Sequence, residues 1–167
     1  MKTQIETGMP YLFFKDTVNK MNPNKHDGMI GSGNLCQESF SNFSPTKVGN
    51  VTINEKTGKI NQESDSGYIH TCNLVSLNLS LLLDRETLAK SCSVAVKILD
   101  NTIDLTVTPI AESNLHNNHY RTIGVGAMGL ADYLAINHLP YKGDSGTLEE
   151  VDKLFEFIAY NVVKTSA

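Results

Sequence analysis

The feature that most constrains the fold is a β-rich segment followed by a long series of apolar residues at helical spacing. Residues 68–79 (YIHTCNLVSLNL) contain many residues that favour strands. Apolar residues then recur at three- and four-residue intervals: Leu88, Cys92, Ala95, Leu99 and Ile103. This spacing predicts a helix with one apolar face, for which Asp84 is a suitable N-terminal cap.

A second amphipathic helix is predicted near the end of the chain. Thr147 and Glu150 have the spacing of a capping box. The apolar residues that follow at helical intervals are Val151, Leu154, Phe155, Ile158 and Val162. The period continues to Ala167, so we expect the chain to end inside an element rather than at a domain boundary.

A short polar stretch, residues 31–38 (GSGNLCQE), carries the chemistry. Asn34, Cys36 and Glu38 are spaced by two, and in an extended segment such residues point to the same side. They would then present an amide, a thiol and a carboxylate to one ligand, after a glycine-rich turn. The alternative is a buried structural cysteine between two surface polar residues, because free cysteine often behaves as a small hydrophobe.

Composition limits the classes of protein that this chain can belong to. Its 167 residues, of which 40% are hydrophobic and 19% charged, suit one packed domain or a piece of a larger one. A net charge of −4 argues against nucleic acid as the main partner. There is no apolar run of about 18 residues for a membrane span and no signal peptide at the start.

The cysteine content points to a reducing compartment. Three cysteines without a C-x-x-C pair make a disulfide scaffold or a zinc ribbon a poor fit, and we expect no metal site. A cytoplasmic chain with free thiols is the expectation. Cys92 lies on the helical stripe and is expected in the core, whereas Cys72 could be core or could face a cleft.

Residues 44–66 are predicted to be a surface excursion. The strand-like segments 51–54 and 59–61 flank a turn that contains Gly58, as in a small polar hairpin. A disordered insertion is the alternative.

Two further patterns are weaker. Gly124, Gly126 and Gly129 fit G-x-G-x-x-G, but the preceding strand is short and the acidic Asp144 lies in a predicted loop, so close packing at a helix start explains them better than a dinucleotide site. Residues 116–119 (HNNH) could offer two metal ligands, but a solvated loop is the preferred interpretation.

The stretch Asn34-Leu35-Cys36-Gln37-Glu38 resembles the N-L-C-x-E finger-loop motif of the large subunit of ribonucleotide reductase. Other segments resemble the same family in the same order: residues 6–11, 71–79, 95–100, 109–111 and 121–126. The resemblance covers nearly the whole chain and is least certain over residues 44–66.

The resemblance implies an α/β fold, a ten-stranded barrel with the finger loop passing through its centre. Residues 1–167 would be part of this catalytic barrel: the finger loop, at about residues 28–40, and the start of the second half-barrel. We name residues 28–40 the 28–40 loop.

The resemblance also implies the roles of four residues in making deoxyribonucleotides. Cys36 would carry a thiyl radical and take the 3′ hydrogen of the ribose, and Glu38 would be the base for the 3′ hydroxyl. Asn34 would bind the sugar hydroxyls, and Cys72 would be one of two reducing thiols. The substrate would lie against the loop, at Gly33, Asn34, Leu35, Cys36 and Glu38.

The implied partners lie outside this chain, which itself would bind no cofactor. The radical would come from a small subunit with a dinuclear metal centre or, alternatively, from adenosylcobalamin. A thioredoxin- or glutaredoxin-type protein would restore the thiols, and complementary large-subunit fragments would complete the barrel.

The departures from the family pattern limit what the chain can do alone. The second reducing cysteine, the allosteric nucleotide regions, the phosphate-binding segment and the tail cysteines have no counterpart here. We therefore expect no turnover by the isolated chain. The remaining hypotheses are a catalytic piece of a split enzyme and an inactive remnant, followed by an unrelated dinucleotide-binding protein.

Overall fold

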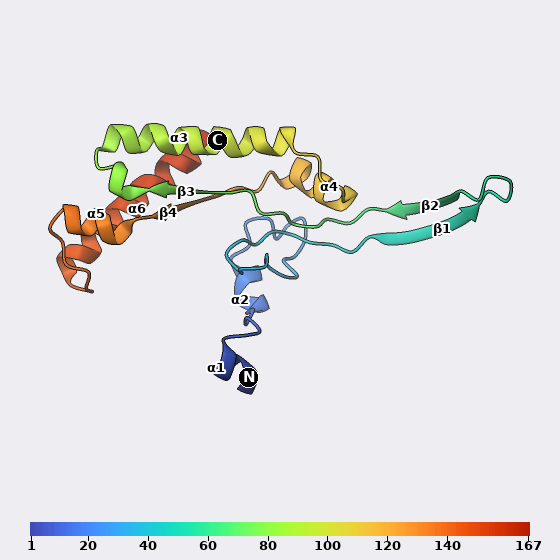
Figure 1. Cartoon of the computed structure of the whole chain (residues 1–167), viewed down its shortest axis with the longest axis horizontal. Helices are drawn as coiled ribbons and strands as arrows, with labels where there is room; N and C mark the ends of the chain where they lie inside the picture. Colours follow the sequence, from blue (N-terminus) through green and yellow to red (C-terminus); the bar gives the residue numbers. More distant parts are fainter. The chain divides into compact units, whose positions relative to one another are not determined.

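The computed structural model describes residues 1–167, which divide into two compact units (Figure 1). Unit 1 comprises residues 1–72 and 107–122, and unit 2 comprises residues 73–106 and 123–167. Each unit contains one two-stranded sheet together with helices, so the chain has the mixed α/β character expected. None of the helices is long and apolar enough to cross a membrane.

Unit 2 is built on two parallel strands. β3 (Leu74–Asn78) pairs with β4 (Gly124–Met128), with Leu74 opposite Gly124. Parallel strands need a long crossover connection, and here it includes the 3-10 helix η1 (Leu79–Leu81) and α3 (Arg85–Leu105).

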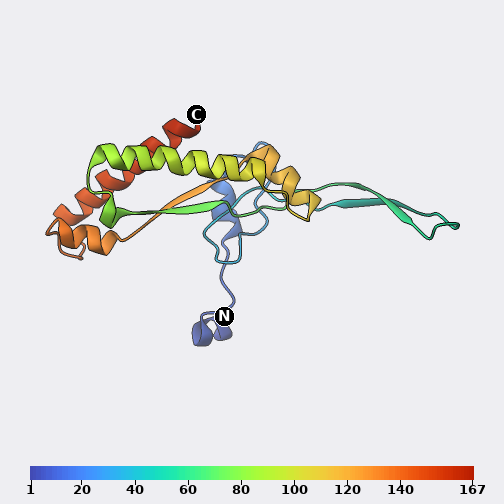
Figure 2. The same cartoon turned by 45° about the horizontal axis from the view of Figure 1, so that its top comes forward.

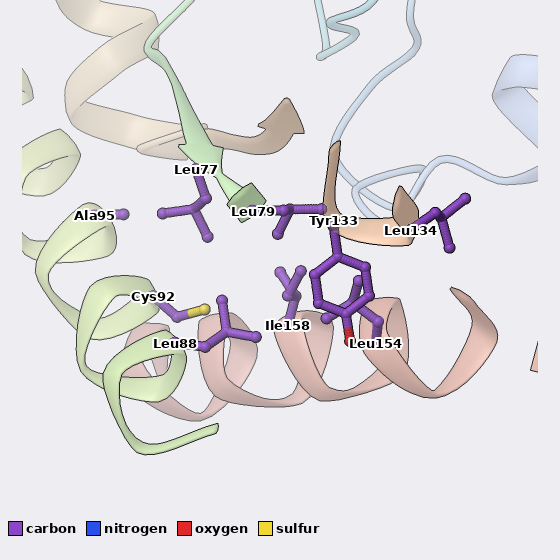
Figure 3. Close-up of a cluster of buried hydrophobic side chains, with 9 residues drawn as sticks. All are labelled: Leu77, Leu79, Leu88, Cys92, Ala95, Tyr133, Leu134, Leu154 and Ile158. Atoms are coloured by element: carbon purple, nitrogen blue, oxygen red, sulfur yellow. The ribbon is translucent and has the colours of Figure 1, made fainter. Parts of the chain in front are cut away.

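Two helices that follow β4 complete unit 2, and with α3 they enclose its core. These are α5 (Leu130–Ile136) and α6 (Ser145–Ser166). Figure 3 shows side chains from β3, η1 and the three helices pointing toward one another: Leu77, Leu79, Leu88, Cys92, Ala95, Tyr133, Leu134, Leu154 and Ile158.

The predicted stripe of α3 is confirmed. All five of its residues are buried, and Asp84 caps the helix by accepting the N–H of Thr87 at 2.8 Å. A three- to four-residue period sustained over about four turns identifies a helix that packs along one face.

The start of α6 differs from the prediction. Asp144 rather than Thr147 caps the helix, because its carboxylate accepts the N–H of Thr147 at 2.9 Å. The Thr147 hydroxyl instead donates to the carbonyl of Pro140 at 3.0 Å. Phe155 is 41% exposed, and Phe157 packs against the core instead.

The three glycines do not form a turn between a strand and a helix. Gly124 and Gly126 lie within β4, and a Cβ on Gly124 would sit 2.5 Å from Leu74 Cδ2. Gly129 has φ +75° immediately before α5. Asp144 caps α6 and does not end a strand, which is the position that the acidic residue of a dinucleotide site takes. The close packing predicted at a helix start applies to Gly129 alone.

Unit 1 carries the hairpin that was expected within residues 44–66. β1 (Lys47–Ile53) and β2 (Ile60–Asp65) are antiparallel, and Gly58 has φ +67° in their connection. Every residue of both strands is exposed. Figure 2 shows the hairpin as a long, thin arm.

Three helices complete unit 1: α1 (Lys2–Thr7), α2 (Lys15–Lys20) and α4 (Ala111–Tyr120). The solvated loop predicted for residues 116–119 is wrong, because these residues belong to α4 and His116 is fully buried. The helix was missed because its buried residues are Ser113, His116 and Asn117, which give no apolar period.

Candidate active site

The 28–40 loop turns back on itself. Gly33 and Phe40 form an antiparallel bridge, and the residues between them form a turn. The extended backbone expected across Asn34, Cys36 and Glu38 is therefore wrong, and so is the inference that alternation places them on one side.

The side chain of Asn34 accounts for the turn. Its Oδ1 accepts the backbone N–H of Glu38 and that of Ser39, each at 3.0 Å. Asparagine often closes turns in this way, because its carbonyl replaces a backbone acceptor. The backbone N–H of Asn34 in turn donates to the Ser39 carbonyl at 3.2 Å.

This turn joins two of the predicted site residues directly. Asn34 Nδ2 donates to Glu38 Oε1 at 2.6 Å. Cys36 lies between them in the sequence, and its side chain is exposed. The amide and the carboxylate thus form a pair on a loop that also presents a free thiol.

Two aromatic rings lie against the backbone of the loop. A Cβ on Gly33 would lie 2.5 Å from Phe40 Cε1, and one on Gly31 would lie 2.7 Å from Phe43 Cδ1. The backbone therefore closely approaches the ring of Phe40 in the loop and that of Phe43 just after it, and glycine is required for that approach. Leu35 is 87% exposed.

The three cysteines have different surroundings. Cys36 and Cys72 are exposed free thiols in unit 1, whereas Cys92 is buried in unit 2, as predicted. Burial raises the pKa of the Cys92 thiol. Cys72 lies in the segment before β3, so the strand indicated over residues 68–79 is confirmed only for Leu74–Asn78 and does not include Cys72.

His70 links the loop to the segment that carries Cys72. Its Nε2 lies 2.7 Å from the Ser39 hydroxyl, and its Nδ1 lies 3.4 Å from the Thr122 hydroxyl. Burial lowers the pKa of His70. Ser39 directly follows Glu38, and Cys72 lies two residues after His70, so the contact connects the two predicted parts of the site.

A second serine–histidine contact lies beside the first. Ser41 Oγ is 3.0 Å from Nε2 of His116, whose ring centroid is 5.1 Å from that of His70. Burial, with a smaller contribution from the charge of His70, lowers the pKa of His116 to about 4. The His116 imidazole is therefore neutral at pH 7.

Tyr120 fixes the two ends of the loop. Its hydroxyl donates to Asp27 Oδ2 at 2.8 Å and accepts from Asn42 Nδ2 at 3.1 Å. His119 also binds Asp27 Oδ2, at 2.7 Å. The hydrogen bond from His119 is the main cause that lowers the pKa of Asp27, and the bond from Tyr120 contributes.

The sequence model of the ribonucleotide reductase barrel domain matches residues 1–167. The chain belongs to this family. Its mixed α/β elements are thus part of the α/β barrel that the resemblance implied.

Curated relatives agree with the family model. A ribonucleoside-diphosphate reductase subunit alpha from Synechocystis is 50% identical over 166 residues, covering 99% of this chain and 18% of the relative. The subunit alpha from Treponema pallidum is 37% identical over 170 residues, covering 99% and 20%. That from Helicobacter pylori is 32% identical over 197 residues, covering 97% and 25%.

The chain therefore matches a segment of the ribonucleotide reductase large subunit. It spans about a fifth of the length of the curated relatives that it matches.

Sequence reasoning missed most of the residues that support the ribonucleotide reductase loop. His116 and Tyr120 are spaced by four, which places them on one face of a helix. Ser39 and Ser41 are spaced by two. These spacings could have indicated that the residues lie on one side of their segments, but the spacing of His116 and Tyr120 does so only once α4 is known to be a helix.

Proposed function

We propose that this chain provides the radical-bearing loop of a ribonucleoside-diphosphate reductase, which converts ribonucleotides to deoxyribonucleotides. The observation that carries the proposal is the Asn34–Glu38 hydrogen bond on the turn that exposes Cys36. The family and the names of its relatives support this chemistry and a diphosphate substrate.

The first step uses the loop. The Cys36 thiyl removes the 3′ hydrogen atom of the ribose, which forms an S–H bond and leaves a radical at C3′. Glu38 accepts the proton of the 3′ hydroxyl, provided that the hydroxyl lies within hydrogen-bond reach. Asn34 holds the Glu38 carboxylate through Oε1 and orients it toward the sugar.

The second step uses the reducing thiols. The 2′ hydroxyl leaves as water, and two thiols supply two electrons and two protons as they close to a disulfide. Cys72 is one of these thiols, and the other comes from outside residues 1–167. Cys36 then returns its hydrogen atom to C3′, which regenerates the thiyl, and Glu38 returns its proton to the 3′ oxygen.

The parts of the reductase outside residues 1–167 define what the loop works with. The radical on Cys36 would come from a small subunit with a dinuclear metal centre or, alternatively, from adenosylcobalamin. A thioredoxin- or glutaredoxin-type protein reduces the disulfide. Because the cycle needs free thiols, we assign it to the cytoplasm.

Ribonucleotide reduction by a reconstituted assembly tests the proposal. This chain would be co-expressed with complementary large-subunit segments and the radical-generating subunit. The wild type should form deoxyribonucleotide, and Cys36→Ser should form none. Cys92→Ala is the matched control, because it removes a thiol that lies in the core of unit 2 and should retain activity.

The remaining variants separate the roles within the site. Glu38→Gln should bind substrate and lose turnover, since the amide cannot accept the proton. Cys72→Ser should lose reduction. An intact assembly without product would identify the chain as an inactive remnant, and product from Cys36→Ser would exclude the radical role of this thiol.

A further inference from the structure

The limb of the loop that follows Glu38 is held by paired serine–histidine contacts. Ser39 contacts His70 at 2.7 Å, and Ser41 contacts His116 at 3.0 Å. The two serines are two residues apart in the sequence, and the centroids of the two imidazole rings are 5.1 Å apart.

The contact at Ser39 adjoins the Asn34–Glu38 pair. The backbone N–H of Ser39 donates to Asn34 Oδ1 at 3.0 Å, and its carbonyl accepts the N–H of Asn34 at 3.2 Å. A displacement of Ser39 would therefore strain both bonds and shift the carboxylate of the residue before it.

The other side of the contact is also fixed. The His70 ring is half-buried, and its second nitrogen lies 3.4 Å from the Thr122 hydroxyl. The next residue, Thr71, donates its hydroxyl to Asn117 Oδ1 at 2.5 Å. The backbone that leads to Cys72 is thus tied to α4, and His70 projects from it onto the loop.

We propose that His70 is a positioning residue. It holds Ser39, and through Ser39 the Asn34–Glu38 pair, in a fixed position relative to the segment that carries Cys72. This inference rests on the proposed function for its catalytic consequence, but its structural consequence is measurable alone. His70 touches no substrate in this scheme and acts through Ser39.

Hydrogen–deuterium exchange of the 167-residue chain tests the structural part. His70→Phe keeps a ring of similar size and removes both nitrogens. We expect amide exchange in residues 33–40 to accelerate about tenfold, because one anchoring hydrogen bond is lost. Exchange in α3 and α6 should stay unchanged. His26→Phe, at an exposed histidine outside these contacts, is the matched control.

Two more variants exclude a general packing effect. Ser39→Ala removes the same contact from the loop side and should accelerate the same amides, with no further acceleration in the double variant. His70→Gln retains an amide that can bind Ser39 and should restore part of the protection. Unchanged exchange in His70→Phe, or acceleration that extends to α3 and α6, would overturn the inference.

Activity of the reconstituted reductase tests the catalytic part. His70→Phe should lower kcat about tenfold or more with little change in KM, because a misplaced base affects the transition state more than binding. Loss of activity in Cys36→Ser with full activity in His70→Phe would remove the positioning role and keep the proposed function. Full activity in Cys36→Ser would remove the proposed function and leave the exchange result to decide the structural role.

Discussion

Asn34 Nδ2 and Glu38 Oε1 lie 2.6 Å apart, and the same asparagine also binds the backbone N–H of Glu38. One side chain thus fixes both the carboxylate of Glu38 and the backbone that carries it. The Glu38 carboxylate is thus held in place two residues after the exposed Cys36 thiol, and the proposed first step would use both groups.

Substitution of Asn34 should separate the backbone role from the side-chain role. Asn34→Ala removes the acceptor for the N–H groups of Glu38 and Ser39, and it should accelerate exchange of both amides. Asn34→Asp keeps that acceptor but places a like charge beside Glu38, so it should keep amide protection and lose turnover. Equal exchange in Asn34→Ala and wild type would show that the turn does not depend on this side chain.

The three thiols should differ in reactivity. Cys36 and Cys72 are exposed and should react quickly with a maleimide at pH 7.5. Cys92 is buried and burial raises its pKa, so it should react only upon unfolding. Mass spectrometry of the modified chain gives the order, and early labelling of Cys92 would contradict the structure of unit 2.

Stability should fall with acid because His116 is buried in its neutral form. Its pKa of about 4 lies below the ordinary value of 6.5, so the unfolded chain binds the proton first as the pH falls. The free energy of unfolding should decrease between pH 6.5 and 4, by on the order of 3 kcal/mol, and should not change above that window through this group.

Denaturant titrations at several pH values test this dependence. His116→Gln should flatten the slope between pH 6.5 and 4, leaving the smaller contribution of His70, whose pKa is lowered in the same direction. A slope as steep as that of the wild type would show that other groups cause the acid sensitivity.

The core of unit 2 should depend on Leu154 far more than on its neighbour. Leu154 is 1% exposed and Phe155 is 41% exposed. Leu154→Ala should lower the free energy of unfolding by about 2–5 kcal/mol, because it removes buried methyl groups and leaves a cavity. Phe155→Ala should cost less, and denaturant unfolding compares the two; a larger loss at Phe155 would contradict the assigned helix face.

The sequence predicted long-range periodic features well. The stripe of α3 follows from spacing alone, since its residues are buried on successive turns, and Asp84 is recognised as the cap from its position before the first turn. Cys92 was correctly assigned to the core from the same spacing. In α6 the apolar period was predicted correctly, but the cap residue Asp144 and the core contact of Phe157 were not. Within one helical turn the sequence pattern fits more than one cap residue and more than one residue at the edge of the apolar face.

The details of the site could not be predicted from spacing. The turn at Asn34 depends on which backbone groups its side chain binds, and an extended segment would have had the same sequence pattern. α4 was missed because polar residues fill its buried face, and only contacts with the loop, such as that between His116 and Ser41, explain their burial. Motif resemblance identified Cys36 and Cys72, but not the His70 contact that joins their segments.

The most direct test of the account is a single cycle of ribonucleotide reduction without added reductant, in which deoxyribonucleotide and free thiols are measured together. The intact assembly should form product and consume the Cys72 thiol, whereas Cys36→Ser should form no product and keep Cys72 reduced. Product from Cys36→Ser, or product from the wild type with Cys72 still a free thiol, would contradict the account.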